Sequence, residues 1–240
     1  MTINKFLLVL GAVVFINTAN AQKTMYDANA QVRNVSSFSG ISVSASIDLY
    51  ISMGTEDAVA VSAKDNSYID RITTEVKNGM LFIGFNGKGI NNWGPKSMKA
   101  YVSVKSINKL QASGACDVIV DGSLNATDLV IDISGASDFN GMVNTQNLRL
   151  QASGSSDFHI SGKAVNARIN VSGSSDVKGY DLVTDNCDIE ASGSSDIKIT
   201  VNRELKAKAS GASDISYKGE PNVKEVRTSG ASDIKRVGGS

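Results

Sequence analysis

The sequence predicts an all-β protein whose C-terminal half is a β-solenoid of about seven similar rungs. Three observations lead to this prediction. One hexapeptide recurs at a regular interval, the residues before each copy alternate between apolar and polar, and the composition combines 22 Gly with only 2 Pro. Short strands joined by tight turns are typical of such a sequence.

The recurring hexapeptide has the pattern S-G-[AS]-[SC]-D-[VFI] and occurs seven times, at intervals of 18–21 residues. Its glycines are expected to form tight turns, because Gly adopts left-handed backbone conformations that other residues avoid. These turn glycines are Gly114, Gly135, Gly154, Gly173, Gly193, Gly211 and Gly230. The aspartates that follow them are Asp117, Asp138, Asp157, Asp176, Asp196, Asp214 and Asp233.

The residues on either side of each hexapeptide are expected to be strands. The side chain four positions before each glycine is apolar, the next is polar, and the third is mostly small or apolar. This period of two is that of a strand with one buried face. Because a unit of two short strands cannot bury its own apolar face, the units are expected to stack, with rungs about 4.8 Å apart.

The N-terminal part of the chain, residues 22–106, is expected to be irregular β-structure. Asn78-Gly79 lies between two apolar segments and predicts a hairpin. We expect this region to cap and continue the repetitive solenoid of residues 107–240, so that residues 22–240 form one continuous body. A bare solenoid end would expose an aggregating strand edge.

Residues 1–21 have the features of a signal peptide. Lys5 precedes the apolar run Phe6–Ile16, and Ala19-Asn20-Ala21 provides a cleavage site, so the mature chain is expected to begin near Gln22. No Cys follows that site, so no lipoprotein anchor is expected, and no later segment is apolar enough to span a membrane. The predicted location is the periplasm, the cell surface or the medium.

Charge and residue chemistry give no indication of catalysis or of a nucleic-acid partner. The chain has 24 basic and 24 acidic residues, which does not favour an anionic partner. The only His, His159, is expected to point outward, while Cys116 and Cys187 lie three to four rungs apart. At about 15–19 Å, this separation exceeds the roughly 7 Å that a disulfide tolerates. We therefore expect two unpaired thiols and no Cys–His nucleophile.

The column of seven aspartates admits two explanations. Each carboxylate can accept hydrogen bonds from backbone N–H groups of the turns, which is the favoured interpretation. The alternative is bound Ca²⁺, held by the same seven aspartates. No cofactor is otherwise expected.

A Gly-rich segment, residues 84–95, interrupts the pattern and holds the only Trp of the chain. Exposed aromatic side chains in long polar loops often bind sugars or proteins. Trp93, Asn91 and Asn92 are therefore the candidate binding residues. The structural alternative is that Trp93 folds back to cover the solenoid end.

Three segments carry a resemblance to a known family: F-S-G-I-S-V at Phe38–Val43, N-G-M-L-F-I at Asn78–Ile83, and the repeated hexapeptide. Over roughly residues 35–234 the chain resembles the head GIN domain family (DUF2807), autotransporter-adhesin-like proteins found mainly in Bacteroidetes. The resemblance implies a right-handed β-helix and a role in cell-surface adhesion, and it brings no catalytic residues.

The favoured function is therefore that of a non-catalytic exported protein that binds a surface glycan or a protein. Two alternatives stay open at this point: a carbohydrate-active β-helix enzyme, such as a lyase or glycosidase, and a self-assembling structural protein of the cell envelope. The sequence leaves the ligand and the oligomeric state undetermined, and oligomerisation is compatible with a stacked fold.

Overall fold

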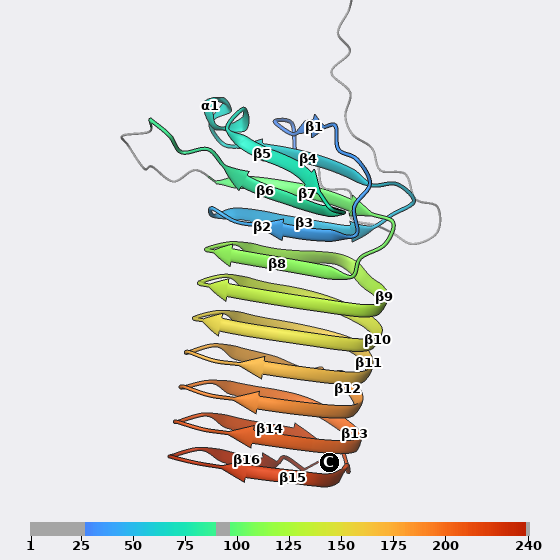
Figure 1. Ribbon diagram of the computed structural model, residues 1–240, viewed down its shortest axis with the longest axis vertical. Coiled ribbons are helices and arrows are strands. Elements are labelled where there is room, and N and C mark those ends of the chain that lie inside the picture. Colours follow the sequence, from blue (N-terminus) through green and yellow to red (C-terminus); the bar gives the residue numbers. More distant parts are fainter. Residues whose placement is uncertain (1–26, 90–96, 239–240) are drawn as a thin grey trace, which may run out of the picture.

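The computed structural model describes residues 27–89 and 97–238. The predicted signal peptide and Asn91, Asn92 and Trp93 lie outside these residues. The described chain forms a single 16-stranded sheet wound into an elongated solenoid, whose rungs lie one above another (Figure 1). The predicted all-β solenoid class is therefore confirmed.

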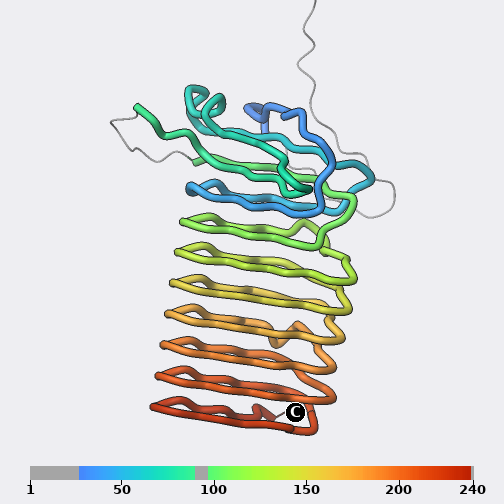
Figure 2. The backbone as a smooth tube through the Cα atoms, viewed as in Figure 1, coloured from blue at the N-terminus to red at the C-terminus, as the bar shows by residue number. Residues whose placement is uncertain are grey.

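Most of the repetitive half consists of long strands that run from the Asp of one hexapeptide to the end of the next apolar–polar segment, and shorter strands lie at its two ends. The bend between successive rungs stays within the ladder, because its backbone remains extended enough to pair with its neighbours. Figure 2 shows this as a continuous chain path from rung to rung. The strands are β8 (Lys109–Gly114), β9 (Asp117–Gly135), β10 (Asp138–Gly154), β11 (Asp157–Val171), β12 (Asp176–Ala191), β13 (Asp196–Ala209), β14 (Asp214–Lys218), β15 (Asn222–Thr228) and β16 (Asp233–Arg236).

Neighbouring rungs pair in parallel, with equivalent residues of the repeat directly above one another. Leu150 of β10 pairs with Ile131 of β9 and with Ile169 of β11, and all three are fully buried. The rings of Phe139 and Phe158 lie 5.5 Å apart between centroids. Inward side chains thus form continuous apolar columns, which is how short strands gain a core.

The seven repeated turns have the same backbone conformation. Their glycines all have positive φ, between 77° and 98°. A Cβ added to Gly173 would lie 2.4 Å from the carbonyl oxygen of Gly154 in the preceding rung. Only Gly allows the turns to stack this closely.

The residue before each repeated Asp points into the solenoid and forms a buried polar column. Ser137, Ser156, Ser175, Ser195 and Ser213 are all fully buried. Their hydroxyls make two kinds of hydrogen bond. The Ser156 hydroxyl donates to the carbonyl of Ser153 in its own turn, and the Ser175 hydroxyl accepts from the backbone N–H of Ser156 in the rung before. The polar groups of the turns are thereby satisfied inside the protein.

An eighth turn, which the sequence pattern did not reveal, precedes the seven. The strands β2 (Gly40–Val43) and β3 (Ile47–Met53) pair in parallel with β8 and β9, so Ser44–Asp48 occupies the place of a hexapeptide turn. Ala45 and Ser46 have positive φ of 67° and 58° where later rungs use one Gly. Asp48 continues the aspartate column, and its Oδ1 lies 3.4 Å from the backbone N of Asp117.

Above this rung, β6 (Met80–Phe85) and β7 (Met98–Val104) form one more parallel layer. The expected hairpin is present: β5 (Ile72–Lys77) pairs antiparallel with β6 across Asn78-Gly79. In the described residues, β2, β3, β6 and β7 thus add parallel layers to the stack.

The same end of the solenoid is closed by antiparallel strands, as Figure 1 shows at its top. Here β4 (Ala58–Ala63) pairs with β7, and β1 (Gln31–Arg33) pairs with β4. A short helix, α1 (Asn66–Ile69), follows β4 and was not predicted. Its local signal is Asp65, whose side chain accepts from the backbone N–H of Ser67 as an N-cap.

Candidate functional site

One face of the solenoid has a single column of outward side chains that crosses the rungs. We call it the polar column, and in the seven repeats it occupies the position three residues before the turn glycine. Ser42 and the apolar Phe82 continue it in register toward the capped end. Register connects each member to the next, from β6 at the capped end to β15 at the other. Its members are Phe82, Ser42, Gln111, Asp132, Gln151, Asn170, Glu190, Lys208 and Arg227.

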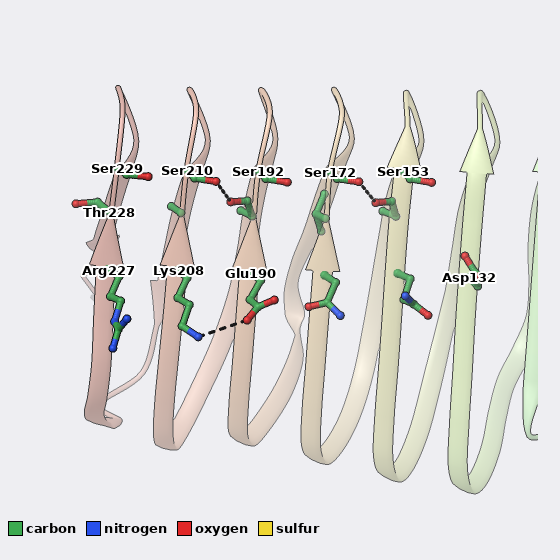
Figure 3. Close-up of a pocket in the computed structure, with 16 residues that line it drawn as sticks. Asp132, Ser153, Ser172, Glu190, Ser192, Lys208, Ser210, Arg227, Thr228 and Ser229 are labelled. Carbon is green, nitrogen blue, oxygen red and sulfur yellow. Dashed lines mark hydrogen bonds and ion pairs between the residues drawn. The ribbon is translucent and has the colours of Figure 1, made fainter.

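A shallow groove of about 650 Å³ lies along the lower part of this column. One side is the polar column from Asp132 to Arg227, and the other is the first serine of each hexapeptide (Figure 3). The hydroxyls of Ser172 and Ser210 lie 3.4 Å from carbonyl oxygens of the rung before. The groove therefore presents a hydroxyl and a polar or charged group on successive rungs.

The charges along the groove are ordered. Asp132 lies at the upper end, where its Oδ2 accepts from Gln111 at 3.2 Å, and Arg227 lies at the lower end. Between them Lys208 and Glu190 form an ion pair of 3.5 Å (Figure 3). The groove thus has an acidic and a basic end.

Asn170 lies in the middle of the groove, between the acidic and basic ends. Its Oδ1 atom is buried and has no hydrogen-bond partner in the described chain. A buried acceptor without a partner is costly.

A second hollow of about 520 Å³ lies at the upper end of the same face. It is lined by Phe82, Met80, Lys109 and Gln111 among others, and Phe82 is 42% exposed. Gln111 borders this hollow and bonds to Asp132 of the groove, so the two form one surface. The sequence analysis did not identify Phe82, although its alternation with the buried Leu81 and Ile83 places it outward.

The aspartate column lies on the opposite side of each turn. The carboxylates of Asp138, Asp176 and Asp214 each accept from the backbone N–H of the aspartate in the next rung, at 3.1, 3.1 and 3.2 Å. Lys178 adds an ion pair to Asp157 at 3.6 Å. These contacts offset the repulsion between stacked carboxylates and favour the structural interpretation of the column.

The calcium alternative for these aspartates gains no support from their geometry. Across residues 27–89 and 97–238 no group of three or more His, Cys, Asp or Glu side chains is arranged to hold a metal ion. The repeated Asp contacts are to backbone and lysine.

The two cysteines are free and buried, as expected from their separation. The Cys116 thiol takes the place of the inward serine and lies 3.3 Å from the carbonyl oxygen of Ser113. Burial raises the pKa of both thiols, that of Cys187 to about 12. His159 is exposed on β11, so these residues form no common site.

The predicted binding residues Trp93, Asn91 and Asn92 lie outside the described residues. The part of their segment that is described is attached to the cap, where the Arg71 guanidinium donates to the carbonyl of Lys88 at 2.9 Å. No helix within the described ranges is long and apolar enough to cross a membrane.

Comparison with known proteins identifies the fold. A family model described as "Putative auto-transporter adhesin, head GIN domain" matches residues 37–221. A "putative adhesin" from Bacteroides fragilis has a TM-score of 0.81 and 23% identity, with 87% of this chain and 96% of that chain covered. No curated protein matches the sequence.

Two further solved structures share the fold. A "putative adhesin" from Parabacteroides merdae has a TM-score of 0.67 and 17% identity, covering 87% of this chain and 95% of its own. A "Putative lipid binding protein" from Parabacteroides distasonis has a TM-score of 0.65 and 22% identity, covering 88% and 97%. At these identities the likeness establishes the architecture, and the ligand has to be argued from the site.

Proposed function

We propose that this chain, which belongs to the head GIN domain family, is a non-catalytic exported protein that binds a glycan at the cell surface. The observation that supports this most directly is the polar column, which joins the Phe82 hollow to the groove on one face. A flat β-surface with an exposed aromatic ring and regularly spaced amides and hydroxyls suits a linear polar polymer.

The chemistry of the face favours a sugar chain. Phe82 offers a ring against which the apolar face of a sugar can pack, and aromatic side chains dominate binding energy where they are exposed in hollows. Gln151 offers an amide on the rung next to that of Asn170. The ordered charges from Asp132 to Arg227 would give the bound polymer a direction.

Binding rather than catalysis is supported by the state of the ionisable groups. The groove carboxylates Asp132 and Glu190 are partnered by Gln111 and Lys208, and the buried cysteines are held in their thiol form by burial. The family model and the solved relatives from Bacteroides fragilis and Parabacteroides merdae are described as "putative" adhesins.

Glycan-array binding of residues 22–240 tests the proposal, with and without chelator. We expect selective binding that Phe82→Ala weakens by about tenfold or more, the size typical of an aromatic anchor. Met142→Ala is the matched control, since Met142 is 44% exposed but lies on the connecting bend away from the groove. The proposal would be contradicted if Phe82→Ala and Met142→Ala bound the glycan equally well. It would also be contradicted if the unmodified protein bound no glycan.

A further inference from the structure

The two ends of the solenoid are built differently. At the capped end, Leu81 and Ala100 of the uppermost parallel rung are fully buried beneath antiparallel strands. At the other end lies the rung made of β15 and β16, which we call the terminal rung. Its inward residues Val223 and Val226 are 42% and 47% exposed.

The terminal rung also has an unpaired strand edge. β15 pairs only with β13 and β16 only with β14 among the described residues, so the outer N–H and C=O groups of both strands have no partner strand. The valines pair in register with Leu205 and Ala207 of the rung above, which are fully buried. An open edge with a half-exposed core is a template for strand pairing.

We infer that the terminal rung binds the terminal rung of a second copy, giving a two-fold symmetric dimer in which the solenoids meet end to end. The strands β15 and β16 are joined by a four-residue turn and run in opposite directions. A two-fold axis parallel to the strands therefore places β15 of each copy antiparallel to β16 of the other.

In this arrangement, residues equally distant from Gly230 lie opposite one another across the interface. Val226 meets Ile234 of the second copy, so exposed core residues cover each other. Arg227 meets Asp233, and Glu225 meets Lys235. The symmetry repeats each pair, so two apolar pairs and four pairs of opposite charge result.

The charges of the isolated chain favour this partner. Arg227 pairs in register with Lys208 of the rung above, and Asp233 pairs with Asp214. Each of these two residues therefore has a like charge on the strand that it already pairs with. Their nearest counterions are on their own strands: Glu225 lies 2.6 Å from Arg227, and Lys235 lies 3.6 Å from Asp233. A second copy would add an opposite charge on the open side and complete an alternating network.

The capped end offers no equivalent surface. Its described outer strand β1 is three residues long, and β5 ends with the ion pair between Glu75 and Lys77. Short and charged edge strands discourage edge-to-edge pairing. Head-to-tail growth into filaments is therefore disfavoured, and a closed dimer is expected.

Sedimentation velocity of residues 22–240, from about 1 to about 200 µM, tests the inference. A single rung is a small interface, so we expect a reversible dimer of micromolar affinity. Glu225→Lys should weaken dimerisation at least about tenfold, because it creates two like-charge pairs. The double exchange Glu225→Lys with Lys235→Glu should restore it to within about threefold of the original.

Val32→Lys is the matched control, since Val32 is 59% exposed on the edge strand at the capped end. It should leave the dimer unchanged, and circular dichroism should show that all variants remain folded. A protein that stays monomeric at the highest concentration would overturn the inference. So would open-ended oligomers, a dimer that Glu225→Lys leaves intact, or a double exchange that fails to restore it.

Discussion

Gly173 provides the sharpest test of how the rungs stack. It has φ of +83°, and an added Cβ would lie 2.4 Å from the carbonyl oxygen of Gly154. That oxygen already accepts a 2.8 Å hydrogen bond from the N–H of Ser174. Gly173→Ala therefore cannot be accommodated by moving a side chain: one turn must shift away from another, and the hydrogen bond between them must lengthen.

The cost can be separated into parts. A left-handed conformation costs an L-residue about 1–2 kcal/mol, and the overpacking adds about 1–3 kcal/mol. Weakening the inter-rung hydrogen bond adds about 1 kcal/mol. We expect Gly173→Ala to lower the free energy of unfolding by about 3–6 kcal/mol in total.

Gly122→Ala is the matched control, because Gly122 has φ of +81° but no atom within 4 Å of the added Cβ. It should cost only the backbone strain of about 1–2 kcal/mol. Urea unfolding followed by circular dichroism measures both variants, with hydrogen exchange of the neighbouring rungs to detect local opening. Equal losses, within about 0.5 kcal/mol, would refute the idea that contact between stacked turns requires Gly.

Three further predictions concern the buried and ionisable groups. Ser175→Ala should lower the free energy of unfolding by about 1–3 kcal/mol, because a buried backbone N–H loses its acceptor; an unchanged urea midpoint would contradict this. Cys116 and Cys187 should be inert to a thiol reagent at pH 8 in the folded protein and react fully in urea, since burial raises the pKa of both; rapid reaction of either thiol in the native state would contradict it. At pH 7, Asp27→Asn should lower the midpoint of thermal unfolding and Asp48→Asn should raise it. Effects of the same sign would contradict the opposite pKa shifts of these two aspartates.

The opposite signs for the two aspartates follow from their surroundings. Burial alone would raise the pKa of Asp27, but hydrogen bonds from the Ser62 and Tyr101 hydroxyls outweigh it and lower that pKa. The stabilisation from Asp27 is therefore present at neutral pH and lost as the pH falls through its folded pKa. Burial raises the pKa of Asp48, and the charge of Asp117 adds to this. The contribution of Asp48 is present at acid pH and lost as the pH rises through its folded pKa.

The repetitive half of the fold could be predicted because the same turn conformation recurs in each rung. Each turn needs a Gly for its positive φ, a small inward polar side chain and an Asp for the next rung, so the same residues return at each interval. The Ser44–Asp48 turn was missed because two consecutive residues, Ala45 and Ser46, take positive φ in place of one Gly. The backbone path is the same, but the residue that marks it in the sequence is absent.

The cap could be predicted only in outline. Asn78-Gly79 indicated its hairpin, since an Asn-Gly turn has a local cause. The pairing of β4 with β7 joins segments about 40 residues apart, and no local pattern specifies it. Helix α1 is a single turn that begins at the Asp65 cap, too short for a periodicity to be visible.

The binding face could not be found from repetition, because repetition identifies the residues that the fold requires. The turn Gly, the inward Ser and the aspartates each have a contact with the next rung that explains their recurrence. The position three residues before each glycine is polar in every rung but carries a different side chain in most, from Gln111 to Arg227. Stacking constrains that position only to be outward and polar, so its chemistry is free to match a ligand. In a solenoid, specificity is therefore expected in the column whose polarity is retained while its residues differ, and the polar column from Gln111 to Arg227 meets that condition.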